Sequence, residues 1–307
     1  MPTPETAREL VEWGARELDK AGLAYGHGTD NAYDEAASLV FSVLQPGQYP
    51  DAGRLDEVVA DELVSAAMQL IELRISTRKP AAYLTREAWF AGMAFYVDER
   101  ALVPRSPIAE LVENRFSPWI VPDRVKRILD LCTGSACIAC ACAREFPAAH
   151  VDAADLSVDA LSVARLNVAR HGLQRQLTLV ESDVFAAITG GPYDIIVSNP
   201  PYVPRDEVRQ LPEEYLHEPS IGLAAGADGL DITIQILENA HRHLSYTGIL
   251  VVEVGYSRPA LEALFPDVPF FWLEFEFGGE GVFLLERGQL AACRESFERV
   301  AGQRADD

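Results

Sequence analysis

The first third of the chain carries the hydrophobic spacing of helices. Over residues 6–20, 32–44 and 55–74, apolar side chains recur at steps of three and four, which is the period of one helix face. Gly, Pro and Asp separate these stretches, as expected for turns between helices. The pattern therefore predicts a helical N-terminal domain over residues 1–87.

A different pattern follows directly. Residues 88–97 are rich in aromatic and β-prone side chains, and Ala91-Gly92 interrupts them near the middle. Such a break between two short strand-like runs is typical of a β-hairpin. We predict a hairpin connector over residues 88–105.

From residue 125 onward, short apolar runs alternate with helical stretches. This alternation is typical of βαβ units and a parallel sheet, and therefore of an α/β fold. Gly278-Gly279-Glu280 interrupts the end of the pattern and predicts a closing antiparallel hairpin. We expect one α/β domain over residues 106–300. Its strands are predicted at residues 127–131, 150–154, 177–181, 193–198, 249–254, 270–277 and 281–286.

Composition narrows the class of partner. The chain has 307 residues, of which 49% are hydrophobic, so it is long and apolar enough to bury a proper core. Its formal net charge is −21, and a surface this acidic repels phosphate backbones and attracts basic proteins. The charge argues against nucleic acid as a direct substrate and favours a basic protein.

The cysteines and the hydropathy indicate in which cellular compartment the protein works. Four of the five cysteines crowd together at Cys132, Cys137, Cys140 and Cys142, which does not suit a disulfide framework. Three of them fall within one predicted helix with spacings unlike a metal site, so we predict small, reduced, buried side chains and no metal. Since no apolar run of about eighteen residues or basic leader occurs, we expect a cytoplasmic protein away from membranes.

Candidate chemistry lies where the predicted strands end, because ligands of open α/β sheets bind beyond the carboxyl ends of the strands. The first such end is a loop of small residues that leads into a helix. Small residues let a ligand approach the backbone, and the helix start offers unpaired N–H groups. A tight turn without a ligand is the alternative, since a dinucleotide site has more glycines. The candidate residues are Asp130, Cys132, Thr133, Gly134, Ser135 and Ala136.

Two further strand ends carry carboxylates. Asp155, followed by Leu156, ends the second strand and has the spacing of an acid that accepts ribose hydroxyls. A helix cap or a solvated acid is the alternative. Asp183 and Val184 follow the third strand. There a carboxylate can accept an adenine amino group beside an apolar edge.

The fourth strand end is the most specific. It continues into Asn199, Pro200, Pro201 and Tyr202. An Asn side-chain oxygen and a proline carbonyl can together accept both N–H bonds of an NH2 group, and an aromatic ring can stack on its plane. Because prolines lack a backbone N–H, few donors compete for these oxygens. The motif favours methyl transfer to a planar amide or amino nitrogen.

These four pieces, in this order, resemble the Class I S-adenosylmethionine-dependent methyltransferases that carry the Asn-Pro-Pro-Tyr motif. Leu102 to Pro107 contain Pro-Arg-Ser-Pro, and that sequence is similar to the protein-glutamine branch acting on a ribosomal protein. The segments from His217 to Pro219, Gly222 to Leu230 and Val252 to Gly255 are similar to the same branch. The resemblance implies a Rossmann-like seven-stranded sheet whose last strand is antiparallel.

The resemblance also implies roles. The cofactor would be S-adenosylmethionine, with Cys132 to Ala136 at its methionine part, Asp155 at the ribose, and Asp183 with Val184 at the adenine. The substrate would be a glutamine of the basic large-subunit ribosomal protein number three, held at Asn199 to Tyr202 and recognised through the N-terminal domain. Ala136 stands where the family usually has glycine, which would weaken cofactor binding.

Two charged residues outside these loops are further candidates for binding substrate. Arg105 would hold an acidic group or pair with Glu110. Glu218, with Glu213 and Glu214, would receive basic residues of the ribosomal protein or belong to a solvated acidic loop.

Three alternatives stay open. They are the sister enzyme that methylates peptide-chain release factors, a nucleic-acid amino methyltransferase, and an inert ribosome-assembly factor with the same fold. The Pro-Arg-Ser-Pro sequence, the acidic charge and the intact Asn-Pro-Pro-Tyr motif argue against them in turn. The oligomeric state is open, a dimer included.

Overall fold

The computed structural model describes residues 4–305 and divides into two compact units. The N-terminal unit runs to Arg105 and also contains Leu211–Glu218. The sheet unit contains Ser106–Gln210 and the chain from Pro219 onward. The sequence predicted domains that are contiguous in the chain. The structure differs because Leu211–Glu218 belongs to the N-terminal unit.

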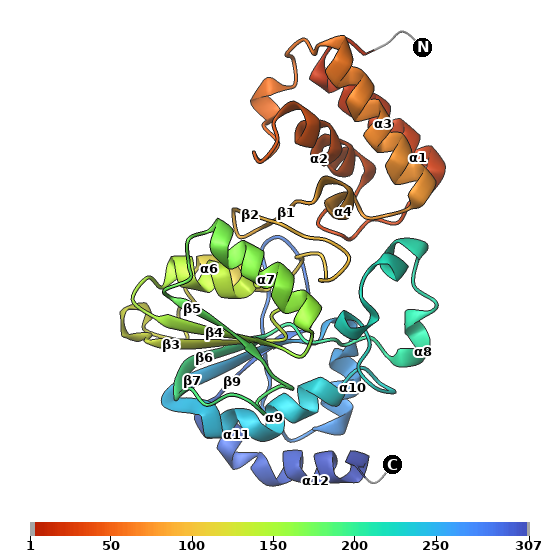
Figure 1. The fold of residues 1–307 in the computed structure, drawn as a ribbon. Coiled ribbons are helices and arrows are strands. Elements are labelled where there is room, and N and C mark those ends of the chain that lie inside the picture. Colours follow the sequence, from red (N-terminus) through yellow and green to blue (C-terminus); the bar gives the residue numbers. More distant parts are fainter. Residues whose placement is uncertain (1–3, 306–307) are drawn as a thin grey trace. The chain divides into compact units, whose positions relative to one another are not determined.

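The N-terminal unit is built on three packed helices (Figure 1). Their shared core is fully buried and includes Leu10, Leu39 and Ile71. The predicted hairpin is confirmed, with Ala88 paired to Phe95 and a turn at Ala91-Gly92. The elements are α1 (Ala7–Ala21), α2 (Ala32–Leu44), η1 (Ala52–Arg54), α3 (Asp61–Thr77), α4 (Ala81–Thr85), β1 (Ala88–Phe90), β2 (Met93–Phe95) and η3 (Glu213–His217).

The third helix begins later than predicted. It was expected from residue 55, but α3 starts at Asp61. Residues 55–60 instead form backbone hydrogen bonds with residues just before α1 and in its first turn. The Leu55 carbonyl accepts from Arg8 N at 2.7 Å, and Val59 N donates to the Glu5 carbonyl at 2.9 Å. These extended contacts override the helical spacing of the apolar side chains.

The sheet unit contains a seven-stranded sheet in the order β5-β4-β3-β6-β7-β9-β8. Strands β3 to β7 are parallel to one another, and β9 runs antiparallel to β7, which confirms the predicted Rossmann-like fold. The strands are β3 (Arg127–Leu131), β4 (His150–Asp155), β5 (Leu177–Glu181), β6 (Tyr193–Ser198), β7 (Leu244–Glu253), β8 (Phe271–Trp272) and β9 (Val282–Glu286).

The strand predicted at residues 270–277 is wrong in length, because β8 covers only Phe271–Trp272. Beyond it the chain leaves the sheet. The Glu276 N–H donates to the Glu110 carboxylate at 3.0 Å, and the Phe277 side chain is 85% exposed. This segment faces solvent and pairs with no strand. Its β-prone residues therefore do not form the hydrogen bonds that would extend β8.

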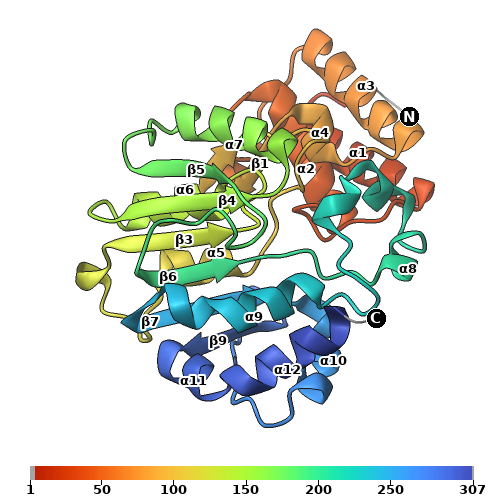
Figure 2. The same ribbon diagram turned by 60° about the horizontal axis from the view of Figure 1, so that its bottom comes forward.

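Helices cover both faces of this sheet (Figures 1 and 2). α6 and α7 pack on β3, β4 and β5, with α5 against α6, whereas α9 and α11 pack on β7 from the opposite face. The remaining helical elements complete the unit. They are α5 (Ile108–Glu113), η2 (Pro122–Arg124), α6 (Cys137–Glu145), α7 (Val158–Arg170), α8 (Arg205–Val208), η4 (Ser220–Gly222), α9 (Asp231–His243), η5 (Gly255–Ser257), α10 (Arg258–Leu264), α11 (Arg287–Ala292) and α12 (Arg294–Ala305).

The cysteines of α6 are packing residues. Cys140 and Cys142 are fully buried, and all five cysteines of the chain are free, as predicted. Burial raises the pKa of each α6 thiol. Between residues 4 and 305 no group of three His, Cys, Asp or Glu side chains is placed to hold a metal ion. Within the same residues, no helix combines the length and apolarity needed to span a membrane.

Candidate active site

The register of the sheet brings the predicted site residues of the sheet unit to one edge. Leu131 pairs with Ala154 on one side and with Ser198 on the other. Asp155 pairs with Glu181, and Ser198 pairs with Val252. The loops that follow these strands therefore leave the sheet side by side. β3 lies at the point where the strand order reverses. In such sheets, ligands usually bind beyond the carboxyl ends of the strands at this point.

The loop after β3 has a backbone suited to glycine at three alternate positions. Cys132, Gly134 and Ala136 have φ of 57°, 55° and 63°. Left-handed φ values are ordinary for Gly and strained for other residues. A Cβ built on Gly134 would meet nothing within 4 Å. The loop therefore has the conformation of a glycine-rich ligand loop, although only one of the three residues is glycine.

Asp130 lies beneath this loop and is fully buried. Its Oδ2 accepts from Thr133 Oγ1 at 2.5 Å and from Ala139 N at 3.1 Å. Its Oδ1 has no hydrogen-bond partner among the described residues. Burial raises the pKa of Asp130 to about 7. A buried acceptor without a donor calls for an explanation, and a bound ligand that donates an N–H would supply one.

Asp155 ties the second strand end to the first. Its Oδ2 accepts from Gly134 N at 2.8 Å, and its Oδ1 accepts from Ser157 N at 2.8 Å. Burial raises the pKa of Asp155 despite these hydrogen bonds. Ser157 caps α7, since its side chain accepts from Ala160 N. Ser157, and not Asp155, is therefore the N-cap of this helix.

The residues expected at the adenine lie on the neighbouring loop. Asp183 is exposed, whereas Val184 is 8% exposed and has φ of 45°. Ser182 Oγ donates to the Val184 carbonyl at 2.9 Å and holds this turn. Leu156, after β4, is 54% exposed. The exposed side chains of Asp183 and Leu156 thus lie at this end of the sheet.

The Asn-Pro-Pro-Tyr loop starts next to the β3 loop. Ser198 Oγ donates to the Leu131 carbonyl at 2.8 Å, just before Asn199. Pro200 is buried, and Tyr202 is half-buried. The Tyr202 carbonyl accepts from Ser257 Oγ at 2.9 Å, and its ring meets the Tyr256 ring edge-on at 5.9 Å. Tyr202 is therefore fixed from both its backbone and its ring.

Sequence reasoning missed the residue that joins these contacts. Glu253 ends β7 and is 5% exposed. Its Oε1 accepts from the Tyr202 hydroxyl at 3.3 Å, and its Oε2 accepts from Ser106 Oγ at 2.5 Å. Ser106 belongs to the Pro-Arg-Ser-Pro sequence. The available signal was the position of Glu253 at a strand end beside the motif strand.

Arg105 and Glu218 bind each other within the N-terminal unit. The two guanidinium nitrogens donate to the two Glu218 oxygens, each at 2.6 Å. Val103 N adds a third hydrogen bond at 3.0 Å, and His27 Nε2 lies at 3.5 Å. Burial alone would raise the pKa of Glu218, but Arg105 and His27 outweigh it and lower the pKa to about 2.

These contacts correct two expectations. Arg105 pairs with Glu218 rather than with Glu110. The idea of a solvated acidic loop is wrong for Glu214 and Glu218, whose side chains are fully buried. Glu214 instead forms an ion pair with Arg78, with an N···O distance of 2.8 Å. Direct contact of Arg105 or Glu218 with substrate stays a prediction, and it would compete with this pair.

Known proteins share both the sequence and the fold. Residues 116–218 match the family model described as "Methyltransferase small domain". In structure, the hMettl16 catalytic domain in complex with MAT2A 3′UTR hairpin 1 has a TM-score of 0.50 at 15% identity. The likeness covers 81% of this chain and 89% of that chain. It supports the fold alone.

The curated relatives match almost the entire chain. A protein of Francisella tularensis subsp. tularensis is 41% identical over 295 residues, covering 96% of this chain and 94% of the relative. A protein of Neisseria meningitidis serogroup B is 47% identical over 286 residues, covering 93% and 94%. Both relatives are named ribosomal protein uL3 glutamine methyltransferase. The chain belongs to this family of ribosomal protein uL3 glutamine methyltransferases.

Proposed function

We propose that this protein methylates the side-chain amide nitrogen of one glutamine in ribosomal protein uL3. The chain is an S-adenosylmethionine-dependent methyltransferase by family, and its relatives are named for uL3. The observation that carries the proposal is the Asn-Pro-Pro-Tyr loop, which leaves the sheet directly beside the β3 loop. That arrangement suits a substrate nitrogen brought next to a cofactor.

The residues at the strand ends fit the cofactor. S-Adenosylmethionine supplies an electrophilic methyl group on a sulfonium. The left-handed β3 loop leaves room for close backbone approach, and Asp130 Oδ1 offers a buried acceptor. We assign Asp155 to the ribose hydroxyls and Asp183 with Val184 to the adenine. Cys132, Thr133, Gly134, Ser135 and Ala136 would contact the methionine part, and Leu156 the ribose or base.

The chain's own residues would orient the substrate. We assign the Asn199 side-chain oxygen and the Pro200 carbonyl as acceptors for the two amide N–H bonds, with Tyr202 against the amide plane. An amide nitrogen is a weak nucleophile because its lone pair is delocalised. Positioning is therefore the main source of rate, and holding two reactants in place can supply several powers of ten. Pro201 stiffens the loop because its ring fixes φ.

The contacts around Tyr202 support this role. Its hydroxyl, ring and carbonyl are each held, by Glu253, Tyr256 and Ser257. Such support keeps a substrate-contacting side chain in one rotamer. Gly255 lies against the same ring, since a Cβ there would sit 2.9 Å from the Tyr202 ring. Glycine at this position thus allows the tyrosine to pack closely.

The substrate assignment is tested by offering several acceptors to the purified protein. Unmethylated uL3, an unmethylated peptide-chain release factor and ribosomal RNA are incubated separately with labelled S-adenosylmethionine. We expect label on one glutamine of uL3, located by tandem mass spectrometry. Label on release factor alone would assign the sister activity, and label on RNA would assign the nucleic-acid activity. Cofactor binding without any transfer would favour an assembly factor.

A further inference from the structure

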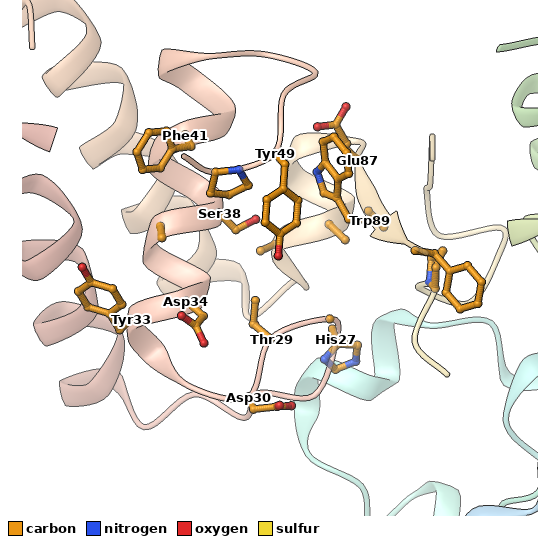
Figure 3. A pocket seen from close by; sticks show the side chains of 18 of the residues that line it. His27, Thr29, Asp30, Tyr33, Asp34, Ser38, Phe41, Tyr49, Glu87 and Trp89 are labelled. Atoms are coloured by element: carbon orange, nitrogen blue, oxygen red, sulfur yellow. The ribbon is translucent and has the colours of Figure 1, made fainter. Parts of the chain in front are cut away.

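The N-terminal unit contains a cavity of about 530 Å³. It lies between α2, the loop that precedes it and the β1–β2 hairpin (Figure 3). Ligand clefts span roughly 300–1,000 Å³, so the cavity is large enough for a long side chain with adjacent backbone. None of the loops that surround the cofactor edge contributes to its lining.

Aromatic rings form much of its wall. Tyr49 and Trp89 lie next to each other, with ring centroids 5.2 Å apart and an edge-on angle of 87° (Figure 3). Tyr49 is 66% exposed and Tyr33 is 41% exposed. Exposed aromatic side chains gathered around a cavity are typical of binding sites. Their faces attract cations, Trp most strongly.

The charge of the lining has one sign. Asp30, Asp34 and Glu87 line the cavity together with His27, and among the described residues no Arg or Lys does. Asp30 and Asp34 are exposed on the loop and on the first turn of α2. Carboxylates and aromatic rings that line one cavity match arginine, whose planar guanidinium pairs with carboxylates and also stacks on rings. The net charge of −21 would draw such a group in from a distance.

The loop that carries the acids is anchored to buried charges. Thr29 Oγ1 donates to Glu35 Oε2 at 3.3 Å, and the other Glu35 oxygen accepts from Arg74 Nε at 2.9 Å. Glu35 and Arg74 are almost fully buried. Gly26 N also donates to the Thr29 carbonyl at 2.8 Å. A wall held in this way loses little conformational entropy when it binds a ligand.

We propose that this cavity binds an arginine side chain in a basic segment of the protein substrate. The cavity acts as an anchoring point formed by residues of the N-terminal unit alone. The identity of the substrate rests on the proposed function, whereas the arginine chemistry rests on the lining itself. The guanidinium would stack on Tyr49 or Trp89 and face Asp30 and Asp34.

Two variants test the proposal on the full-length protein. The double variant Asp30→Asn/Asp34→Asn removes two charges, and Tyr49→Ala removes an exposed ring. Each should raise KM for uL3 about tenfold, which lies within the range of cation–aromatic and charged contacts. The kcat at saturating uL3 and the affinity for S-adenosylmethionine should not change, because these residues lie outside the proposed active site.

A matched control carries the same loss of charge elsewhere in the unit. Glu62→Gln/Glu72→Gln alters two exposed acids on α3 that do not line the cavity. It should raise KM for uL3 by less than about threefold, through weaker steering alone. Equal effects of the two double variants would overturn the proposal, because they would indicate net charge rather than a site.

A binding measurement separates this proposal from the proposed function. A capped Arg-Gly-Arg tripeptide is titrated into the wild type and the cavity variants by NMR, with capped Glu-Gly-Glu as the negative probe. Binding of the arginine probe that the cavity variants weaken supports the site even if uL3 is not methylated. No binding, or equal binding by wild type and variants, overturns it. Self-association lost only in the cavity variants would also overturn it, in favour of a second copy.

Discussion

The Arg105–Glu218 pair gives a sharp test of how Leu211–Glu218 is held in the N-terminal unit. Arg105→Ala leaves the Glu218 carboxylate buried without its bidentate partner. Removing one partner of a buried ion pair typically destabilises a protein by about 3 to 5 kcal/mol. We expect a loss in this range for the N-terminal unit. Arg105→Lys keeps the charge but not the fork of donors, and it should fall between the wild type and the Ala variant.

The pKa of Glu218 gives a second route to the magnitude. It falls from an ordinary 4.5 to about 2. Each tenfold change in proton affinity is worth about 1.36 kcal/mol, so the charged form contributes roughly 3 kcal/mol. Because the folded pKa is lowered, this stabilisation is complete above pH 4.5. It is lost as the pH falls from 4.5 towards 2.

The assay is urea unfolding of the wild type, of Arg105→Ala, of Glu218→Ala and of the variant that combines both substitutions. Hydrogen exchange of the amides in residues 211–218 reports on this segment directly. The double variant should lose less than the sum of the two single variants, because the single variants each strand one charge. A loss below about 1 kcal/mol for Arg105→Ala, or strictly additive losses, would refute the reasoning.

Three further predictions concern the strand ends of the sheet unit. Ala136→Gly relieves a left-handed strain of about 1 kcal/mol and removes a buried methyl group of similar worth, so the melting temperature should move by less than about 4 °C; a larger gain would mean that the methyl group is not packed. Asp130→Asn should remove a pH dependence. The folded carboxyl, with its pKa raised from 3.8 to about 7, retains a proton that the unfolded chain loses, so wild-type stability falls as the pH rises through this window. A constant difference in melting temperature between the two proteins from pH 4 to pH 8 would contradict this. Glu253→Gln replaces an acceptor of the Ser106 and Tyr202 hydroxyls by an amide, and we expect kcat to fall about tenfold at unchanged cofactor affinity; an unchanged kcat would remove Glu253 from the positioning of Tyr202.

The ends of the central strands were predictable because these strands are buried on both faces. The apolar runs that become β3 and β6 have the predicted limits, since a buried parallel strand needs continuous apolar side chains. β5 also has its predicted limits, although it lies at the edge of the sheet and exposes Thr178 and Glu181. The loop after β3 could be recognised for the same reason, since it stands where a buried strand meets a helix. Its left-handed backbone at Cys132 and Ala136 was hidden because neither residue is glycine.

The buried ion pairs were not predictable. Glu218 lies 113 residues from Arg105 in the chain, and the surrounding acids suggest a solvated loop when only local sequence is considered. Burial of a carboxylate depends on a partner supplied by the tertiary fold. The limits of helices depend on tertiary contacts in the same way. Residues 55–60 have helical spacing but form extended bonds to the chain around α1, and no local pattern encodes these contacts.

The central claim is that Asn199 orients an amide nitrogen for methyl transfer, and single-turnover kinetics on Asn199→Ala test it most directly. The methylation rate of uL3 and the cofactor dissociation constant are measured on the same preparation. The account predicts a loss of rate of about a hundredfold or more, with cofactor affinity within a few-fold of the wild type. Wild-type transfer by this variant, or a loss explained entirely by weaker cofactor binding, would contradict it.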